Sequence, residues 1–169
     1  MAEPFADKVI QRIGQAAELY HRLILLVAPA GAGKTTALKD VHKRTATPLV
    51  NVNLELSRRM LDLTERQRAL QLPRLLSEIV DTFVPDVVLL DNIEVLFDIS
   101  LKQDPLRLLQ GLSRNKTVVA AWSGSIDGEY VVYATPDHPE YKRYPLRDFL
   151  YVCASKVERK TSGEICGED

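Results

Sequence analysis

A loop rich in glycine and alanine, APAGAGKTT at residues 28–36, ends in a lysine and two threonines. Gly31 and Gly33 allow the backbone to curl so that successive N–H groups point inward, an arrangement that suits phosphate oxygens. A lysine and a hydroxyl residue at the end of such a loop reach the β- and γ-phosphates and ligate Mg²⁺. The spacing therefore predicts a site for ATP with Mg²⁺. The loop residues expected to contact the nucleotide are Pro29, Ala30, Gly31, Ala32, Gly33, Lys34, Thr35 and Thr36.

The position of this loop in the chain supports the same chemistry. The apolar run RLILLVA at 22–28 precedes it, and the helix-forming residues of 34–44 follow it. The loop therefore joins a predicted strand to a predicted helix, whose N-terminus attracts anions. One residue departs from the usual pattern, because Ala28 occupies the position of the first glycine. An ordinary glycine-rich turn is the alternative, but the lysine and threonine that follow favour a phosphate site.

A second element is a short apolar strand that ends in a carboxylate, VVLLD at 87–91. Asp91 has the form of a Walker B aspartate, which helps to hold Mg²⁺. We therefore expect Thr35 and Asp91 to be the metal ligands. A whole predicted strand, 49–54, lies between the two elements in the sequence. This order is compatible with phosphate-loop ATPases whose sheet has an extra strand between the two Walker strands.

Hydrolysis needs a group that orients or deprotonates water. Many ATPases of this class have Glu directly after the Walker B aspartate, whereas this chain has Asn92. Glu94 could accept the proton if the chain turns after Asp91, or it could be a solvated residue at a helix start. Asn92 could instead position water without taking its proton, which would make turnover slow. The expected catalytic residues are Lys34, Asp91, Asn92 and Glu94.

Side chains from later in the chain could sense or neutralise the γ-phosphate. Ser123 follows the predicted fourth strand, 117–122, whose end should face that phosphate. We expect Ser123 to contact the nucleotide, although a serine before glycine could also be an ordinary turn residue. An arginine from a neighbouring subunit could neutralise transition-state charge. The candidates are Arg114, Arg143 and Arg147, each of which could instead be a plain surface residue.

Hydrophobic periodicity predicts alternating helices and strands, which favours a parallel sheet covered on both faces. The predicted fold is α/β, a three-layer phosphate-loop core with a mainly parallel five-stranded sheet and no C-terminal helical lid. We expect one nucleotide-binding domain at 1–156 and a polar, disordered tail at 157–169. The expected helices are 4–18, 34–44, an interrupted region at 55–82 with a capping box from Thr64 to Gln67, and 104–115. The expected strands are 22–28, 49–54, 85–92, 117–122, a hairpin strand at 130–135, and 149–154.

Composition limits the classes of function. The 169-residue chain has 46% hydrophobic residues and a formal net charge of −1. It can therefore bury a sizeable core, and it has no overall field that would drive it onto nucleic acid or a membrane. Lys142 and Arg143 beside Tyr141 and Tyr144 could contact DNA, but the net charge supports this only weakly. No stretch approaches the ~20 apolar residues of a membrane span, so we expect a cytoplasmic protein without a membrane partner.

Longer phrases of the sequence resemble one family. The chain resembles BrxF, the small AAA-like phosphate-loop ATPase of type 3 BREX phage-defence systems, over about residues 5–153. The phrases are APAGAGKTT, VNVNLELSRRMLDLTERQRALQLPRLL, LLDNIEVLF, LKQDPLRLLQGLSRN and HPEYKRYP. The resemblance implies that Gly31, Gly33, Lys34 and Thr35 bind phosphate and Mg²⁺ and that Asp91 belongs to Walker B. It also implies other BREX proteins as partners.

The function that these observations favour is ATP binding with slow hydrolysis inside an anti-phage defence complex, together with self-association that depends on nucleotide. One alternative is a nucleotide switch that binds ATP but hardly hydrolyses it and acts as a regulatory or assembly module. A small-molecule kinase is a third class. Its signature would be an arginine-rich lid over the phosphates, and the sequence shows no clear lid.

Overall fold

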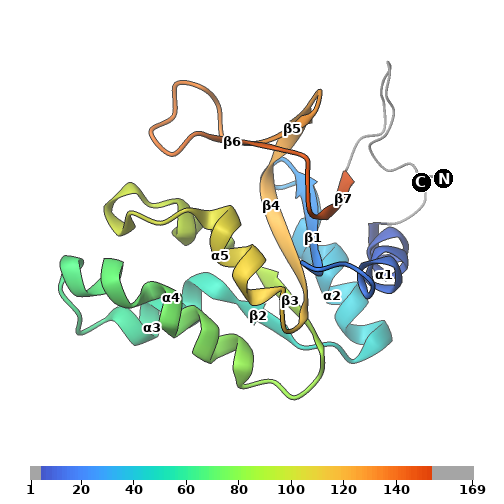
Figure 1. Ribbon diagram of the computed structural model, residues 1–169, viewed down its shortest axis with the longest axis horizontal. Coiled ribbons are helices and arrows are strands. Elements are labelled where there is room, and N and C mark those ends of the chain that lie inside the picture. Colours follow the sequence, from blue (N-terminus) through green and yellow to red (C-terminus); the bar gives the residue numbers. More distant parts are fainter. Residues whose placement is uncertain (1–4, 154–169) are drawn as a thin grey trace.

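The computed structural model describes residues 5–153, which form a central sheet with helices on both faces (Figure 1). One face carries α1 (Phe5–Ala16) and α2 (Lys34–Thr45), and the other carries α3 (Val52–Met60), α4 (Glu65–Asp81) and α5 (Pro105–Leu112). Two short 3-10 helices, η1 (Ile93–Phe97) and η2 (Ile99–Leu101), precede α5. The strands are β1 (Leu23–Ala28), β2 (Leu49–Asn51), β3 (Val87–Asp91), β4 (Thr117–Asp127), β5 (Tyr130–Tyr133), β6 (Lys142–Pro145) and β7 (Leu150–Cys153). The predicted three-layer α/β fold is confirmed.

The parallel part of the sheet has the strand order β2-β3-β4-β1-β7. β4 pairs in parallel with β1 on one side and with β3 on the other. It therefore separates the strand before the phosphate loop from the strand that ends in Asp91, as the sequence predicts. Because parallel strands end at the same edge of a sheet, the residues that follow β1 and β3 meet there.

β1 lies at the centre of the hydrophobic core, and every one of its residues is buried. Alternate side chains of a strand point to opposite faces of the sheet. Leu25 and Val27 pack in the core beneath α3, α4 and α5, whereas Ile24 and Leu26 pack in the core beneath α1 and α2. Burial on both faces explains why this strand is a continuous aliphatic run in the sequence.

The second strand is shorter than predicted. β2 ends at Asn51 and α3 begins at Val52, so the predicted strand 49–54 is wrong over its last three residues. The Asn51 side chain accepts a hydrogen bond of 3.0 Å from the backbone N–H of Leu54. This bond caps the first turn of α3, and asparagine is among the best N-cap residues. The predicted capping box between Thr64 and Gln67 is confirmed at the start of α4.

The connection from β4 to β7 is made of strands. β4 continues past the predicted end at 122 to Asp127 and forms the expected hairpin with β5, which in turn pairs with β6. β5 and β6 extend the five parallel strands to a sheet of seven. Trp122 packs against both Tyr133 and Tyr144, and Phe97 of η1 packs against Trp122 and Tyr133. These rings anchor the antiparallel extension to the core.

Three expectations concern residues outside the described part of the chain. The polar tail at 157–169, the domain end at 156 and the lack of a helical lid all fall after residue 153. They stay predictions. Within the described residues, no helix combines the length and apolar character that a membrane crossing would require.

Candidate functional site

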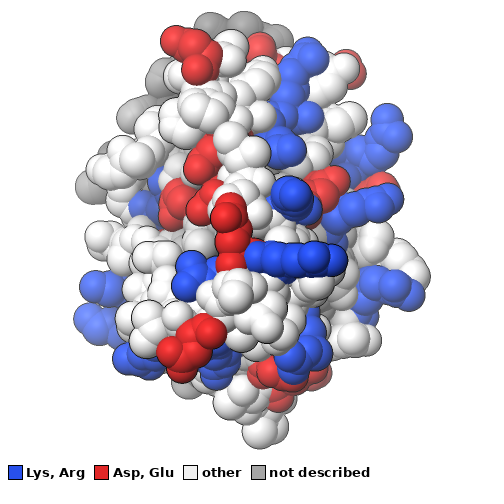
Figure 2. All heavy atoms as spheres, turned by 90° about the vertical axis from the view of Figure 1, so that its left-hand side faces the viewer, with Lys and Arg blue, Asp and Glu red and all other residues white. Residues whose placement is uncertain are grey.

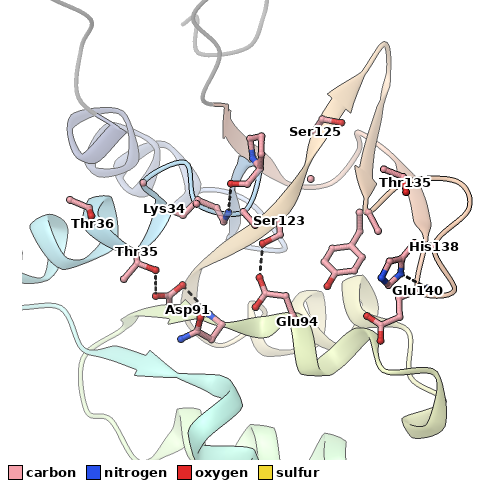
Figure 3. A pocket seen from close by; sticks show the side chains of 18 residues that line it. Lys34, Thr35, Thr36, Asp91, Glu94, Ser123, Ser125, Thr135, His138 and Glu140 are labelled. Atoms are coloured by element: carbon pink, nitrogen blue, oxygen red, sulfur yellow. Dashed lines mark hydrogen bonds between the residues drawn. The ribbon is translucent and has the colours of Figure 1, made fainter.

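A cavity of about 900 Å³ lies at the edge of the sheet where β1 and β3 end (Figure 3). Its walls come from the glycine-containing loop and the start of α2, from the segment after β3, from the middle of β4, and from the β5–β6 connection. Open α/β sheets bind ligands at this edge, outside the carboxyl ends of their strands. The lining residues are Pro29, Ala30, Gly31, Gly33, Lys34, Thr35, Thr36, Asp91, Asn92, Glu94, Ser123, Gly124, Ser125, Tyr133, Ala134, Thr135, His138 and Glu140.

The glycine-containing loop has the backbone that a phosphate cradle needs. Gly31 and Gly33 have φ angles of 81° and 95°, in the region that glycine alone adopts without strain. Ala28 is not among the residues with positive φ and ends the buried strand β1. An alanine in place of the usual first glycine is therefore compatible with this loop, and the departure seen in the sequence carries no backbone strain.

Lys34 lies inside this loop rather than in solvent. The residue is 7% exposed, and its Nζ donates hydrogen bonds of 3.0 Å and 2.9 Å to the backbone oxygens of Ala28 and Pro29. Burial lowers the pKa of Lys34, while the nearby carboxylates of Glu94 and Asp91 act to raise it. A buried ammonium group held by its own loop is placed to interact with an anion that enters the cavity.

Thr35 and Asp91 come together as the sequence predicts. The Thr35 hydroxyl donates a hydrogen bond of 2.7 Å to Oδ2 of Asp91, and Oδ1 of Asp91 accepts one of 2.9 Å from the backbone N–H of Asn92. A hydroxyl and a carboxylate are ligands that suit Mg²⁺. The described residues contain no group of three or more His, Cys, Asp or Glu side chains that could hold a metal. A Mg²⁺ ion here would therefore complete its shell with phosphate oxygens and water.

The chain turns sharply after Asp91, which brings Glu94 to the cavity. Asn92 has a φ of 56°, in the left-handed region, and η1 begins immediately after it. Asparagine tolerates this conformation better than other residues with a side chain. Glu94 lines the cavity, and its Oε2 accepts a hydrogen bond of 2.5 Å from the Ser123 hydroxyl. The structure thus contains the turn after Asp91 that a role of Glu94 as proton acceptor requires.

Most of the predicted site residues meet at this cavity. Ala32 belongs to the loop but is not part of the lining. Thr36 contributes to the wall from the first turn of α2, where Figure 3 shows it at the far side of the loop from Glu94. Ser123 lies inside the long strand β4 rather than at its end, so the prediction of a strand end there is wrong. The prediction of 122 as the end of β4 failed because the hairpin pairing with β5 prolongs the strand.

The three candidate arginines lie outside the lining of this cavity. The Arg143 guanidinium stacks 3.6 Å from the centre of the Tyr130 ring on the antiparallel extension. The Arg114 guanidinium lies 5.4 Å from the centre of the Tyr20 ring, before β4 begins and hence near the opposite edge of the parallel strands. Arg147 is exposed after β6. None acts on the cavity of its own chain in this structure, and a role in a neighbouring subunit stays a prediction.

Sequence reasoning missed the wall that the antiparallel extension contributes. Seven lining residues come from it: Gly124, Ser125, Tyr133, Ala134, Thr135, His138 and Glu140. His138 lines the cavity, and its Nδ1 accepts a hydrogen bond of 3.0 Å from the backbone N–H of Glu140. The one sequence signal for this wall was the hairpin expected directly after Ser123. If Ser123 faces the nucleotide, the hairpin that follows it must lie beside the nucleotide as well.

Comparison with known proteins agrees with this arrangement. The model of the ATPase family associated with various cellular activities (AAA) matches residues 24–127, which run from β1 through the phosphate loop and Asp91 to the end of β4. This match spans more than half of the chain. No curated protein matches the sequence. With the strand order, the loop and the cavity in agreement, the chain belongs to the AAA family and is a nucleotide-binding ATPase of that family.

Proposed function

We propose that the chain binds ATP with Mg²⁺ in this cavity and hydrolyses it slowly, as a cytoplasmic component of a bacterial BREX anti-phage defence system. The observation that carries the nucleotide part is the convergence of four side chains on one cavity: Lys34, Thr35, Asp91 and Glu94 (Figure 3). They come from the start of α2, the end of β3 and η1. A buried cation, a hydroxyl–carboxylate pair and a second carboxylate are the parts that phosphoryl transfer to water requires.

Each of these residues has a distinct task in hydrolysis. Lys34 exchanges its bonds to loop carbonyls for bonds to the β- and γ-phosphate oxygens. Thr35 and Asp91 would hold Mg²⁺, which would supply positive charge to neutralise the phosphates. Glu94 accepts a proton from water as the water oxygen bonds to the γ-phosphorus and the bond from that phosphorus to the β-γ bridging oxygen breaks. Ser123 keeps one oxygen of Glu94 in place while the other stays available.

The scarcity of positive charge in the described cavity lining supports slow turnover. Arg114, Arg143 and Arg147 do not line it, so within the described chain Lys34 is the only lysine or arginine there. A neighbouring subunit would have to supply an arginine to the transition state. The proposal therefore includes a homo-oligomer of this chain that forms when nucleotide is bound. It also includes contacts between the chain and other BREX proteins.

The BREX assignment depends on the family-like phrases of the sequence, which lie in α3, α4, α5 and the β6 region as well as in the two Walker elements. A contact with DNA receives little support from charge. On the side of the molecule that carries α3 and α4, Lys and Arg side chains are interspersed with Asp and Glu (Figure 2). A nucleic-acid site is typically a stripe or patch of one sign.

A nucleotide switch that hardly hydrolyses ATP is the second candidate. The observation that favours it is Asn92 at the position directly after Asp91, where many related ATPases have glutamate. In this alternative Glu94 stays hydrogen-bonded to Ser123 and does not accept a proton from water. A small-molecule kinase ranks third, since the described part of the chain places no arginine over the loop.

Substitution of Lys34 tests the nucleotide part of the proposal. Lys34→Ala should abolish tight ATP binding, because no other lysine or arginine of the described chain lines the cavity. Lys39→Ala is the matched control, as Lys39 is an exposed residue of the same helix. Fluorescence titration with labelled ATP gives the affinities, and thermal melting shows whether the fold is retained. Equal affinity of wild type and Lys34→Ala would reject the phosphate-loop site.

A further inference from the structure

The part of the cavity beyond the phosphate loop has an acidic wall. Glu94 enters it from η1 and Glu140 from the β5–β6 connection (Figure 3). Together with Asp91 they place three carboxylates in the lining, against Lys34 as the only lysine or arginine among the described residues there. Lys34 belongs to the loop half of the cavity, where it bonds to Ala28 and Pro29. Glu94 is within electrostatic range of Lys34, whose pKa it acts to raise, whereas Glu140 forms no ion pair with a lysine or arginine of the described residues.

A buried hydroxyl near these carboxylates has no hydrogen-bond partner among the residues that the structure describes. Tyr133 lines the cavity and is only 6% exposed. Its ring is fixed by stacking on Phe97 at 3.5 Å between centroids and by an edge contact with Trp122. Among the residues that the structure describes, none forms a hydrogen bond with the Tyr133 hydroxyl. Burial raises the pKa of Tyr133, and the charges of Glu94 and Glu140 raise it further, so both carboxylates lie within electrostatic range of the phenol.

We infer that this far half of the cavity is a second binding subsite, for an organic cation such as a guanidinium or primary ammonium group. Glu94 and Glu140 supply the opposite charge, and the Tyr133 hydroxyl accepts one N–H bond. Thr135 and Ser125 add hydroxyl groups to the same lining. This inference rests on the proposed function in one respect: a nucleotide in the loop half would bring further negative charge to the border of the subsite.

The chemistry excludes the other common ligands of such a subsite. An anion in the far half would meet the carboxylates of Glu94 and Glu140, while Lys34, the one lysine of the described lining, is bonded to the loop oxygens of Ala28 and Pro29. An apolar group would leave the half-buried Glu140 carboxylate and the buried Tyr133 hydroxyl without water or a side-chain partner from the described residues, which is costly. A cation can pair with Glu140 and donate to the Tyr133 hydroxyl at the same time, and charge-assisted hydrogen bonds are the strongest kind available. His138, the remaining titratable group of the wall, already uses Nδ1 to accept the Glu140 backbone N–H.

The experiment uses the full chain and a matched pair of probes. Arginine amide carries the guanidinium group, and citrulline amide has nearly the same shape without the charge. Each is titrated calorimetrically into the chain alone and into the chain with Mg²⁺ and a non-hydrolysable ATP analogue. We expect binding of arginine amide at least about tenfold tighter than that of citrulline amide, and tighter still with the nucleotide analogue present.

Two variants and a control locate the probe. Glu140→Gln should weaken the binding of arginine amide by about tenfold, and Tyr133→Phe by about three- to tenfold, since it removes only the hydroxyl. Asp137→Asn is the matched control, because Asp137 is an exposed acid of the same connection outside the lining. Its affinity should equal that of wild type. Melting temperatures within a few degrees of wild type establish that Tyr133→Phe is folded.

The results distinguish a cation supplied by a second copy of this chain from a separate cationic molecule. They also distinguish failure of the cation subsite from failure of the proposed function. If light scattering shows an assembly with nucleotide that arginine amide dissociates in wild type, the cation comes from a second copy of this chain. If the chain stays monomeric and the probe binds, the source is a separate cationic molecule. Equal affinity for the two probes, or for wild type, Glu140→Gln and Tyr133→Phe, would overturn the subsite. A chain that binds arginine amide but no nucleotide would instead contradict the proposed function and leave the subsite standing.

Discussion

The hydroxyl of Ser123 donates a hydrogen bond of 2.5 Å to Oε2 of Glu94, and this bond joins β4 to η1 across the cavity. It fixes the one carboxylate of η1 that lines the cavity. Because Glu94 stands beside Asp91 and Lys34 in the same lining, its position is that of a group that could take a proton from water. Proton acceptance by Glu94 would not need a carboxylate directly after Asp91.

Glu94→Gln should bind ATP with wild-type affinity and lose turnover by roughly 10²–10⁴-fold, because the amide keeps the shape but cannot accept a proton. Phosphate release under saturating ATP measures turnover, and calorimetry measures affinity. Glu129→Gln is a suitable control, since Glu129 is an exposed acid at the hairpin turn and does not line the cavity. Undiminished turnover in Glu94→Gln would remove Glu94 from the chemistry and favour the switch.

Asn92 can be tested separately for its side chain and for its backbone. Asn92→Gly removes the amide but accepts the φ of 56°, whereas Asn92→Ala removes the amide and adds strain of about 1 kcal/mol. We expect both variants to lose less turnover than Glu94→Gln, and only Asn92→Ala to lose stability. Chemical denaturation and phosphate release give the two quantities. A loss of turnover in Asn92→Gly as large as that in Glu94→Gln would make Asn92 the main water-positioning group.

The predicted site residues that the structure brings together most directly are those whose placement follows from local pattern and strand order. Thr35 and Asp91 follow two apolar strands, and the rules for parallel sheets bring the ends of those strands together. Glu94 depended on one backbone angle, the left-handed φ of Asn92, which no periodicity reveals. Tyr133 and the rest of the β5–β6 wall depend on the register of an antiparallel pairing that is not local, and hydrophobic pattern alone does not specify it.

Gly124 is essential for that pairing. A Cβ at this position would lie 1.8 Å from the backbone oxygen of Val132, the oxygen that also accepts the Trp122 indole N–H at 3.1 Å. Gly124→Ala should therefore lower the free energy of unfolding by about 1–3 kcal/mol or more. Gly14→Ala is the contrasting control. Gly14 lies in α1 with nothing within 4 Å of an added Cβ, so alanine should stabilise the chain by about 0.5–1 kcal/mol. Urea denaturation compares the two, and equal effects would contradict the close contact at Gly124.

Self-association should depend on nucleotide and involve Arg143 or Arg147. The cavity has one lysine and no arginine among its described lining residues, so a neighbour would have to bring an arginine to the γ-phosphate. Arg143 is exposed and stacked on Tyr130, and Arg147 is exposed after β6. Arginine and tyrosine are enriched where subunits meet. Light scattering without nucleotide, with ADP and with a non-hydrolysable ATP analogue should show a larger mass with the ATP analogue alone.

Substitution of each candidate arginine shows which one reaches the γ-phosphate of a neighbouring subunit. Arg→Ala at the active position should reduce turnover by about 10³-fold or more, the range found for arginines supplied in trans. Arg→Lys should recover little, because an ammonium lacks the planar pair of donors. Arg143→Ala also removes the contact with Tyr130, so its melting temperature must be compared with that of Arg143→Lys. A monomer in every nucleotide state would exclude the trans arginine. An assembly with full turnover in both alanine variants would move the role to Arg114, whose place near the opposite edge of the parallel strands suits it to reach another copy rather than its own cavity.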